Sequence, residues 1–186
     1  LHTEARTFED FNIPVKMIAT DLNNGDKVII DSGNIIESIR ASISVPGIFT
    51  PVHLNDKWLV DGGLVDPVPV KVVRNMGADI VIAVDISTPL KKREELISVL
   101  SITSQLTGIL TRRNTEGQIA TLSGKDILIV PDLGGNSSAD FKESGQAVPK
   151  GSAAAEQHRE RLAALDIPDD TYAVRCRALA GRQATS

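Results

Sequence analysis

A carboxylate, Asp61, stands where an apolar strand pattern ends, and two glycines, Gly62 and Gly63, follow it before a helical pattern opens. Open α/β folds keep their ligands and their chemistry where strands give way to loops. The Asp-Gly-Gly string also fits a tight structural turn in which the acid only caps nearby amides. The string therefore predicts one of two things, a turn or a functional carboxylate at the edge of a sheet.

Two hairpins are predicted in the first third of the chain. Each pairs two short apolar strand patterns across a turn of Asn, Asp or Gly residues, the residue types that tight hairpin turns favour. The strands are expected at residues 14–22 and 27–30 in the first hairpin, and at residues 52–54 and 57–60 in the second. Asp61 then lies at the exit of the last of these strands.

One helix is predicted before the second hairpin and another after it. The first ends at Pro46, which cannot donate the next backbone hydrogen bond. The second begins with Asp66 as the N-cap and Pro67 as the first helical residue, and it ends at Gly77. The expected buried faces are Ile35, Ile36, Ile39 and Ile43 in the first helix, and Val68, Val72, Val73 and Met76 in the second.

The second half of the chain predicts further strands and helices. Residues 79–86 are nearly all Val, Ile and Ala, typical of a strand that is covered on both faces. Residues 94–122 predict a long helix, or two helices if Gly108 or Gly117 interrupts it. The remaining expectations are a strand at 126–130, a loop at 134–138 and helices at 152–165 and within 168–186. Together these elements predict an α/β fold with a mixed, mainly parallel central sheet between helix layers.

Composition narrows the classes of function. A chain of 186 residues with 41% hydrophobic residues can bury a core of its own. Its net charge of −4 gives no electrostatic reason to expect nucleic acid binding. The single cysteine, Cys176, cannot form an internal disulfide, and the three histidines show no metal-ligand spacing. No leader peptide is visible, and no apolar run approaches the roughly 20 residues of a membrane-spanning helix.

Several strings in this order resemble the second half of the patatin-like phospholipase domain. They are Ala19-Thr20-Asp21-Leu22, the stretch from Arg40 to Val52, the stretch around Asp61 and the stretch from Met76 to Asp85. The likeness continues through Thr111-Arg112-Arg113-Asn114, Val130-Pro131-Asp132-Leu133 and Ser138-Ala139-Asp140-Phe141. These later strings are similar to the bacterial branch in which a secreted patatin-like domain is joined to an outer-membrane barrel.

The resemblance implies an acyl hydrolase that cleaves phospholipids or other lipid esters with a Ser-Asp dyad and no metal or organic cofactor. Asp61 matches the position of the acid that contacts the serine directly. An ordinary carboxyl group titrates near 4, so partial burial beside Leu59, Val60 and Leu64 is expected to raise its basicity. Gly62 and Gly63 are expected to take positive φ and to admit the loop that carries the serine.

The nucleophile is not expected within this chain. No Gly-x-Ser-x-Gly motif occurs in the 186 residues, and the family's serine motif and oxyanion loop lie upstream of the matching segment. Ser42 and Ser44 fall late in a predicted helix without flanking glycines, so we expect them either to pack in the interior or to bond to backbone groups. Asp21 and Asp85 each close a strand and are expected to cap loops, with a place along the same sheet edge as the alternative. The chain alone is therefore expected to be inactive, as the C-terminal portion of one patatin-like domain.

Three questions stay open on sequence alone. The apolar stripe between Leu96 and Leu110 predicts ordinary core packing, with contact to lipid as the alternative. Arg112 and Arg113 fit either lipid phosphate or the end of a helix. A binding module without hydrolysis, which holds a lipid or a partner protein, is the alternative function.

The expected partners are an acyl-ester lipid and the missing N-terminal part of the domain. The expected location is the bacterial cell envelope or exterior, or else the cytoplasm.

Overall fold

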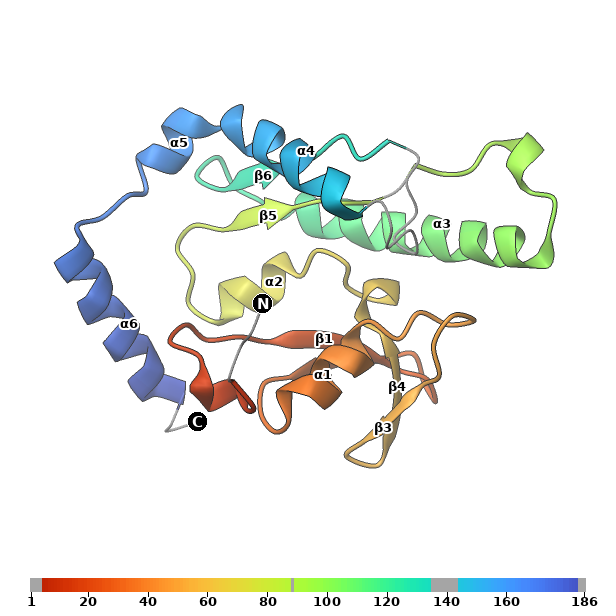
Figure 1. The fold of residues 1–186 in the computed structure, drawn as a ribbon, viewed down its shortest axis with the longest axis horizontal. Coiled ribbons are helices and arrows are strands. Elements are labelled where there is room, and N and C mark those ends of the chain that lie inside the picture. The colour runs from red at the N-terminus through yellow and green to blue at the C-terminus, as the bar shows by residue number, and fades with distance from the viewer. Residues whose placement is uncertain (1–4, 88, 135–143, 184–186) are drawn as a thin grey trace. The chain divides into compact units, whose positions relative to one another are not determined.

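Two antiparallel hairpins form the larger sheet of the protein (Figure 1). A computed structural model describes residues 5–87, 89–134 and 144–183. The chain divides into two units, Leu1–Val65 with Asp166–Ser186 and Asp66–Leu165. Helices and strands occur in both units, which confirms the α/β class.

The first unit holds a four-stranded sheet in the order β2-β1-β4-β3. Its strands are β1 (Met17–Asp21), β2 (Lys27–Ile30), β3 (Val52–Leu54) and β4 (Lys57–Asp61). Both hairpins are confirmed. Asn55 and Asp56 in the second turn have φ of 50° and 59°, the left-handed backbone that a two-residue hairpin turn with matching twist requires.

The sheet is antiparallel throughout, so the prediction of a mainly parallel central sheet is wrong. Tight turns join only antiparallel neighbours, and both connections within the hairpins are tight turns. Among the described strands, parallel pairing occurs in the second unit, where β5 (Ile82–Val84) lies beside β6 (Ile127–Ile129). These two strands are separated in sequence by a long helix, as a parallel connection demands.

Helix α1 (Ile35–Ser42) packs on the four-stranded sheet and starts at the N-cap Asn34, whose side chain accepts hydrogen bonds from the N–H groups of Ile36 and Glu37. The core beneath it consists of Phe8 from the short helix η1 (Phe8–Asp10) and of Ala19, Ile30, Ile35, Ala41, Val52 and Leu59. Small side chains at Ser38 and Ala41 let the helix approach the sheet closely.

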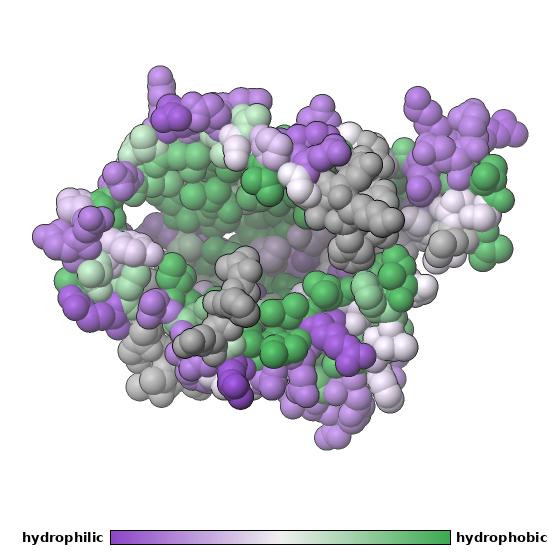
Figure 2. Space-filling view, in the orientation of Figure 1, coloured by the Kyte–Doolittle hydropathy of each residue, from purple (hydrophilic) through white to green (hydrophobic). Residues whose placement is uncertain are grey.

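The predicted apolar face of α1 is wrong beyond its first residue. Ile35 is 2% exposed, but Ile36 is 68% exposed, and Ile39 and Ile43 are also exposed. The helix instead buries Ile35, Ser38 and Ala41. Ser38 can be buried because its hydroxyl donates a hydrogen bond to the Asn34 carbonyl at 2.8 Å. Figure 2 shows the resulting hydrophobic surface over α1.

The second unit begins with a helix that starts later than predicted. Helix α2 (Val70–Asn75) follows Pro69, so neither Asp66 as N-cap nor Pro67 as first helical residue is correct. A residue that precedes proline avoids helical backbone, and Val68 precedes Pro69. Gly77, with φ of 92°, ends the helix as predicted.

Strand β5 is shorter than predicted and is covered on one face only. Val81 and Ala83 are buried with Val68 and Val70, whereas Ile82 and Val84 are each 48% exposed. Continuous apolar sequence therefore does not mean burial on both faces here. Strand β6 is confirmed, and Ile127 and Ile129 pack under helix α4 (Ser144–Glu156).

Helix α3 (Val99–Ile119) is continuous through Gly108 and Gly117. Ser98 caps it and accepts a hydrogen bond from the N–H of Ser101. The predicted core packing of its apolar stripe is wrong, because the described members from Val99 onward are exposed: Val99, Ile102, Leu106, Ile109 and Leu110. A short helix, η3 (Arg93–Glu95), precedes it.

The C-terminal helices are α4, α5 (Arg159–Ala163) and α6 (Asp169–Gln183). The single helix expected at 152–165 is thus two helices, and the first of them begins earlier, at Ser144. The helix expected within 168–186 is confirmed. The loop expected at 134–138 and the Ser138 to Phe141 string lie outside the described residues, except for Gly134.

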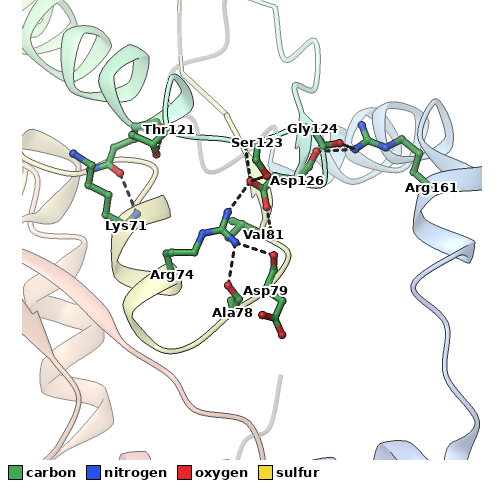
Figure 3. A network of polar contacts seen from close by, with 11 residues as sticks. Lys71, Arg74, Ala78, Asp79, Val81, Thr121, Ser123, Gly124, Asp126 and Arg161 are labelled. Carbon is green, nitrogen blue, oxygen red and sulfur yellow. Dashed lines mark hydrogen bonds and ion pairs between the residues drawn. The ribbon is translucent and has the colours of Figure 1, made fainter.

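A buried carboxylate ties the second unit together (Figure 3). Asp126 precedes β6, and its oxygens accept hydrogen bonds from the N–H of Ser123 at 2.7 Å and from the N–H of Val81 at 2.8 Å. The Arg74 guanidinium, at the end of α2, pairs with it at 2.7 Å. Arg161 of α5 donates to the Asp126 carbonyl.

Candidate active site

Asp61 is the last residue of β4 and lies opposite Ala19 of β1 in the sheet register. It is also the N-cap of the short helix η2 (Gly62–Leu64). Its backbone N–H donates to the carbonyl of Ser44 at 2.9 Å, which joins the strand end to the segment that follows α1. The predicted position, at the junction of a strand and a loop, is therefore where the structure places it.

The two carboxylate oxygens of Asp61 differ in their surroundings. Oδ1 accepts a hydrogen bond from the N–H of Gly63 at 2.6 Å. Within the described residues, Oδ2 has no hydrogen-bond partner. One oxygen therefore fixes the orientation of the side chain, while the other can accept a proton.

Burial raises the pKa of Asp61, and the hydrogen bond from the Gly63 N–H opposes that rise. The net direction is upward, because the half-buried carboxyl group loses more hydration than a single amide returns. A raised pKa makes this group a better proton acceptor than an ordinary aspartate. The predicted cause, partial burial, is the largest contribution.

Gly62 is glycine because the backbone of β1 comes too close for any side chain. A Cβ at this position would lie 2.0 Å from the Ile18 carbonyl oxygen. Neither Gly62 nor Gly63 has a positive φ, so that part of the prediction is wrong. Their conformation serves the packing of η2 against β1, and admission of a serine-bearing loop stays a prediction.

Ser42 and Ser44 bond to backbone groups, as predicted. The Ser42 hydroxyl donates to the Ile18 carbonyl at 2.7 Å, and the Ser44 hydroxyl donates to the Arg40 carbonyl at 2.6 Å. Ser44 is fully buried. Neither hydroxyl donates to the Asp61 carboxylate.

The other acids cap loops or lie buried. Asp21 accepts from the N–H of Asn23 at 3.0 Å, and Asp85 accepts from the N–H of Ser87 at 2.9 Å, as expected of acids at strand ends. Asp66 is buried in the second unit.

Arg112 forms an exposed ion pair with Glu116 one turn later in α3. The interpretation of Arg112 and Arg113 as charges at a helix end is wrong, because α3 continues to Ile119.

Within the described chain, no three His, Cys, Asp or Glu side chains are grouped so that they could hold a metal ion. None of the described helices combines the length and apolar character needed to cross a membrane.

A shallow groove of about 400 Å³ lies in the first unit, away from Asp61. It is lined by Phe11, Asn12, Ile13, Val15, Tyr172, Ala173 and Cys176. A hydrogen bond with the Cys176 thiol raises the pKa of Tyr172. None of the predicted site residues lines this groove.

Thr20 contacts the candidate site residue Asp61, and it was not among the residues predicted from the sequence. Its hydroxyl donates to the carbonyl of Asp61 at 2.8 Å across the β1–β4 pair. Its only sequence signal is its place as a polar residue in the Ala19-Thr20-Asp21-Leu22 string, directly before an acid. A polar residue within an otherwise apolar strand is the general form of that signal.

Residues 4–74 match the family model for patatin-like phospholipase, and this segment includes Thr20, Asp61 and both site glycines. An uncharacterized NTE family protein of Mycobacterium tuberculosis is 38% identical over 79 residues, which make up 42% of this chain and 22% of that protein. A second uncharacterized NTE family protein of that species is 41% identical over 56 residues, or 30% of this chain and 10% of that protein.

A fungal relative carries the name of an activity. Lysophospholipase NTE1 of Meyerozyma guilliermondii is 35% identical over 80 residues, which are 43% of this chain and 6% of that protein. The aligned part of the chain thus spans about a fifth or less of the length of these curated relatives. The likeness of the later strings to the secreted bacterial branch stays a prediction.

Proposed function

Residues 4–74 belong to the patatin-like phospholipase family, and we propose that this chain supplies the general base, Asp61, of a serine-dependent lipid acyl hydrolase. The observation that carries the proposal is the state of the Asp61 carboxyl group. It is half-buried, it is oriented through Oδ1 by the Gly63 N–H, and it has an open second oxygen among the described residues. The name lysophospholipase on a relative supports a lipid ester as the substrate class.

The chemistry assigned to Asp61 is proton transfer in two steps. Oδ2 takes the proton of a serine hydroxyl as the serine oxygen attacks the ester carbonyl, and the departing alcohol then takes that proton. A water molecule repeats the exchange. It gives one proton to Asp61, attacks the acyl-enzyme and releases the fatty acid as the serine recovers its proton.

The serine comes from polypeptide outside these 186 residues. The chain holds no Gly-x-Ser-x-Gly motif, and the hydroxyls of Ser42 and Ser44 are engaged with backbone carbonyls. An oxyanion hole also needs backbone N–H donors near that serine, and the same missing segment is the proposed source of them.

The decisive experiment is Asp61→Asn in the full-length parent protein, assayed on a phospholipid and on a chromogenic ester. We expect turnover to fall by at least about a thousandfold with the far-UV circular dichroism spectrum unchanged, since loss of a general base in a serine hydrolase has effects of this order. Substantial retained turnover would exclude Asp61 as the base. The isolated 186-residue chain should show no ester hydrolysis and no labelling by a fluorophosphonate probe.

A binding module is the second candidate, and the exposed apolar stripe of α3 favours it. Val99, Ile102 and Leu106 follow helical spacing and face solvent. Such a stripe can contact a lipid surface without any hydrolysis. Co-sedimentation of the chain with phosphatidylcholine vesicles, compared with Leu106→Glu, tests this candidate; equal partitioning of both proteins would exclude the stripe as the lipid contact.

A further inference from the structure

Contacts from neighbouring segments hold the backbone of Asp61 and Gly62 in place. Ser42 donates to the carbonyl of Ile18, the oxygen against which Gly62 packs. Ser44 presents its own carbonyl to the N–H of Asp61 at 2.9 Å. Thr20 donates to the carbonyl of Asp61 at 2.8 Å and is itself only 5% exposed. Both backbone polar groups of Asp61 are therefore held from neighbouring segments.

The Thr20 contact acts at the point where the chain leaves the strand. The Asp61 carbonyl belongs to the Asp61–Gly62 peptide. The following peptide, Gly62–Gly63, carries the Gly63 N–H that donates to Oδ1 of Asp61 at 2.6 Å. Rotation of that peptide unit would carry the Gly63 N–H away from the carboxylate. The Ile18 carbonyl blocks movement of Gly62 toward β1. The Thr20 hydroxyl, on β1, holds the Asp61 carbonyl by its hydrogen bond.

We propose that Thr20 is a positioning residue, whose hydroxyl fixes the Asp61–Gly62 peptide so that the Gly63 N–H stays on Oδ1 and leaves Oδ2 free for the nucleophile's proton. This inference rests on the proposed role of Asp61 as the base. Thr20 itself touches neither the carboxylate nor any reacting atom.

The test compares Thr20→Val, which keeps the shape and removes the donor, with Thr20→Ser, which keeps the donor. The Asp61 carboxyl is titrated by carbon-13 NMR in the isolated chain. Loss of the Gly63 contact should raise the Asp61 pKa further in Thr20→Val, because that contact favours the charged form. Thr20→Ser should restore the original value.

Ser38→Ala is the matched control, since it removes another buried hydroxyl that donates to a carbonyl, at 2.8 Å within α1. It should leave the Asp61 pKa unchanged. In the full-length parent, Thr20→Val should lower kcat about tenfold to a hundredfold with little change in KM, and Thr20→Ser should recover kcat. An unchanged Asp61 pKa in Thr20→Val, or no recovery in Thr20→Ser, overturns the proposal.

The two proposals fail in different ways. If Asp61→Asn keeps turnover while Thr20→Val still shifts the Asp61 pKa, the base assignment is wrong and the positioning contact stands. If Thr20→Val does not fold, the hydrogen bond is measured in the wild-type chain as slow exchange of the Thr20 hydroxyl proton. A hydroxyl proton that exchanges freely with water would then overturn the contact.

Discussion

The half-buried carboxyl group of Asp61 costs folding stability at neutral pH, and the same burial favours its protonated form. Burial raises its pKa, so the folded protein binds this proton more tightly than the unfolded chain does. The free energy that this group contributes to folding is fully present below its pKa in the unfolded chain, near 3.9. It is lost as the pH rises through the higher pKa of the folded protein. At neutral pH the charged form therefore disfavours the folded state.

Asp61→Asn should for that reason stabilise the isolated chain at pH 7. The amide oxygen can still accept from the Gly63 N–H, and the buried charge is gone. We expect Tm to rise by about 2–4 °C, the change that roughly 1 kcal/mol produces in a chain of this size. Thermal unfolding at pH 7 and at pH 3 measures it, and the gain should vanish at pH 3. A lower Tm at pH 7 would contradict the desolvation of Asp61.

Gly62 is expected to tolerate no side chain. Gly62→Ala places a Cβ 2.0 Å from a backbone oxygen that cannot rotate away, so we expect a loss of roughly 2–3 kcal/mol in the free energy of unfolding. Gly117→Ala is the control, and it should raise the free energy of unfolding. Nothing lies within 4 Å of the added Cβ, and alanine stabilises the helix α3 by about 0.5–1 kcal/mol relative to glycine. Urea denaturation compares the two; equal stability would exclude the close approach.

At the scale of elements, Asp126 holds α2, β5, β6 and α5 in one network. Backbone N–H groups of Ser123 and Val81, and then Arg74, hold the pKa of this carboxyl group far below its usual range. A lowered pKa contributes stability that is present above the unfolded value near 3.9 and is lost as pH falls through the folded value.

Asp126→Asn should therefore lower Tm at pH 7 by roughly 5 °C or more, because Arg74 loses its partner and a buried acceptor is replaced by an amide. The difference from wild type should shrink as pH falls below about 4. Glu116→Gln, which breaks the exposed pair with Arg112, should change Tm by less than about 1 °C. Equal effects of the two substitutions would show that the Asp126 network is not buried.

Turn chemistry predicted the elements of this fold better than apolar spacing predicted their burial. Asn55-Asp56 and Asn24-Gly25-Asp26 specify tight hairpins, and the strands beside them begin and end within a few residues of expectation. The buried face of α1 was not predictable from its isoleucines, because Ser38 is buried after bonding to its own helix. The Asp-Gly-Gly motif singled out Asp61 as a candidate, whereas the contact of Thr20 with Asp61 joins residues that are 41 apart in sequence and left no local pattern.

At the scale of the whole molecule, the chain exposes large apolar side chains on both of its units. Ile36, Ile39 and Ile43 are exposed on α1 and at its C-cap. In the second unit, Ile82 and Val84 of β5 are exposed, as is the stripe of α3. A stable monomer rarely leaves this many large apolar side chains in contact with water. The proposed serine-bearing segment, absent from these 186 residues, would have apolar surface available for packing.

The isolated chain should accordingly self-associate as its concentration rises. We expect the weight-average sedimentation coefficient to increase between about 5 and 200 μM, since exposed apolar patches of this kind drive association. Ile39→Glu and Leu106→Glu, each at an exposed position, should each reduce the increase, whereas Glu37→Gln on α1 should not. If the serine-bearing segment of the full-length parent covers this apolar surface, the parent should not co-sediment with the isolated chain when the two are mixed. A monomer throughout this range would mean that the exposed isoleucines of α1 do not form an adhesive surface.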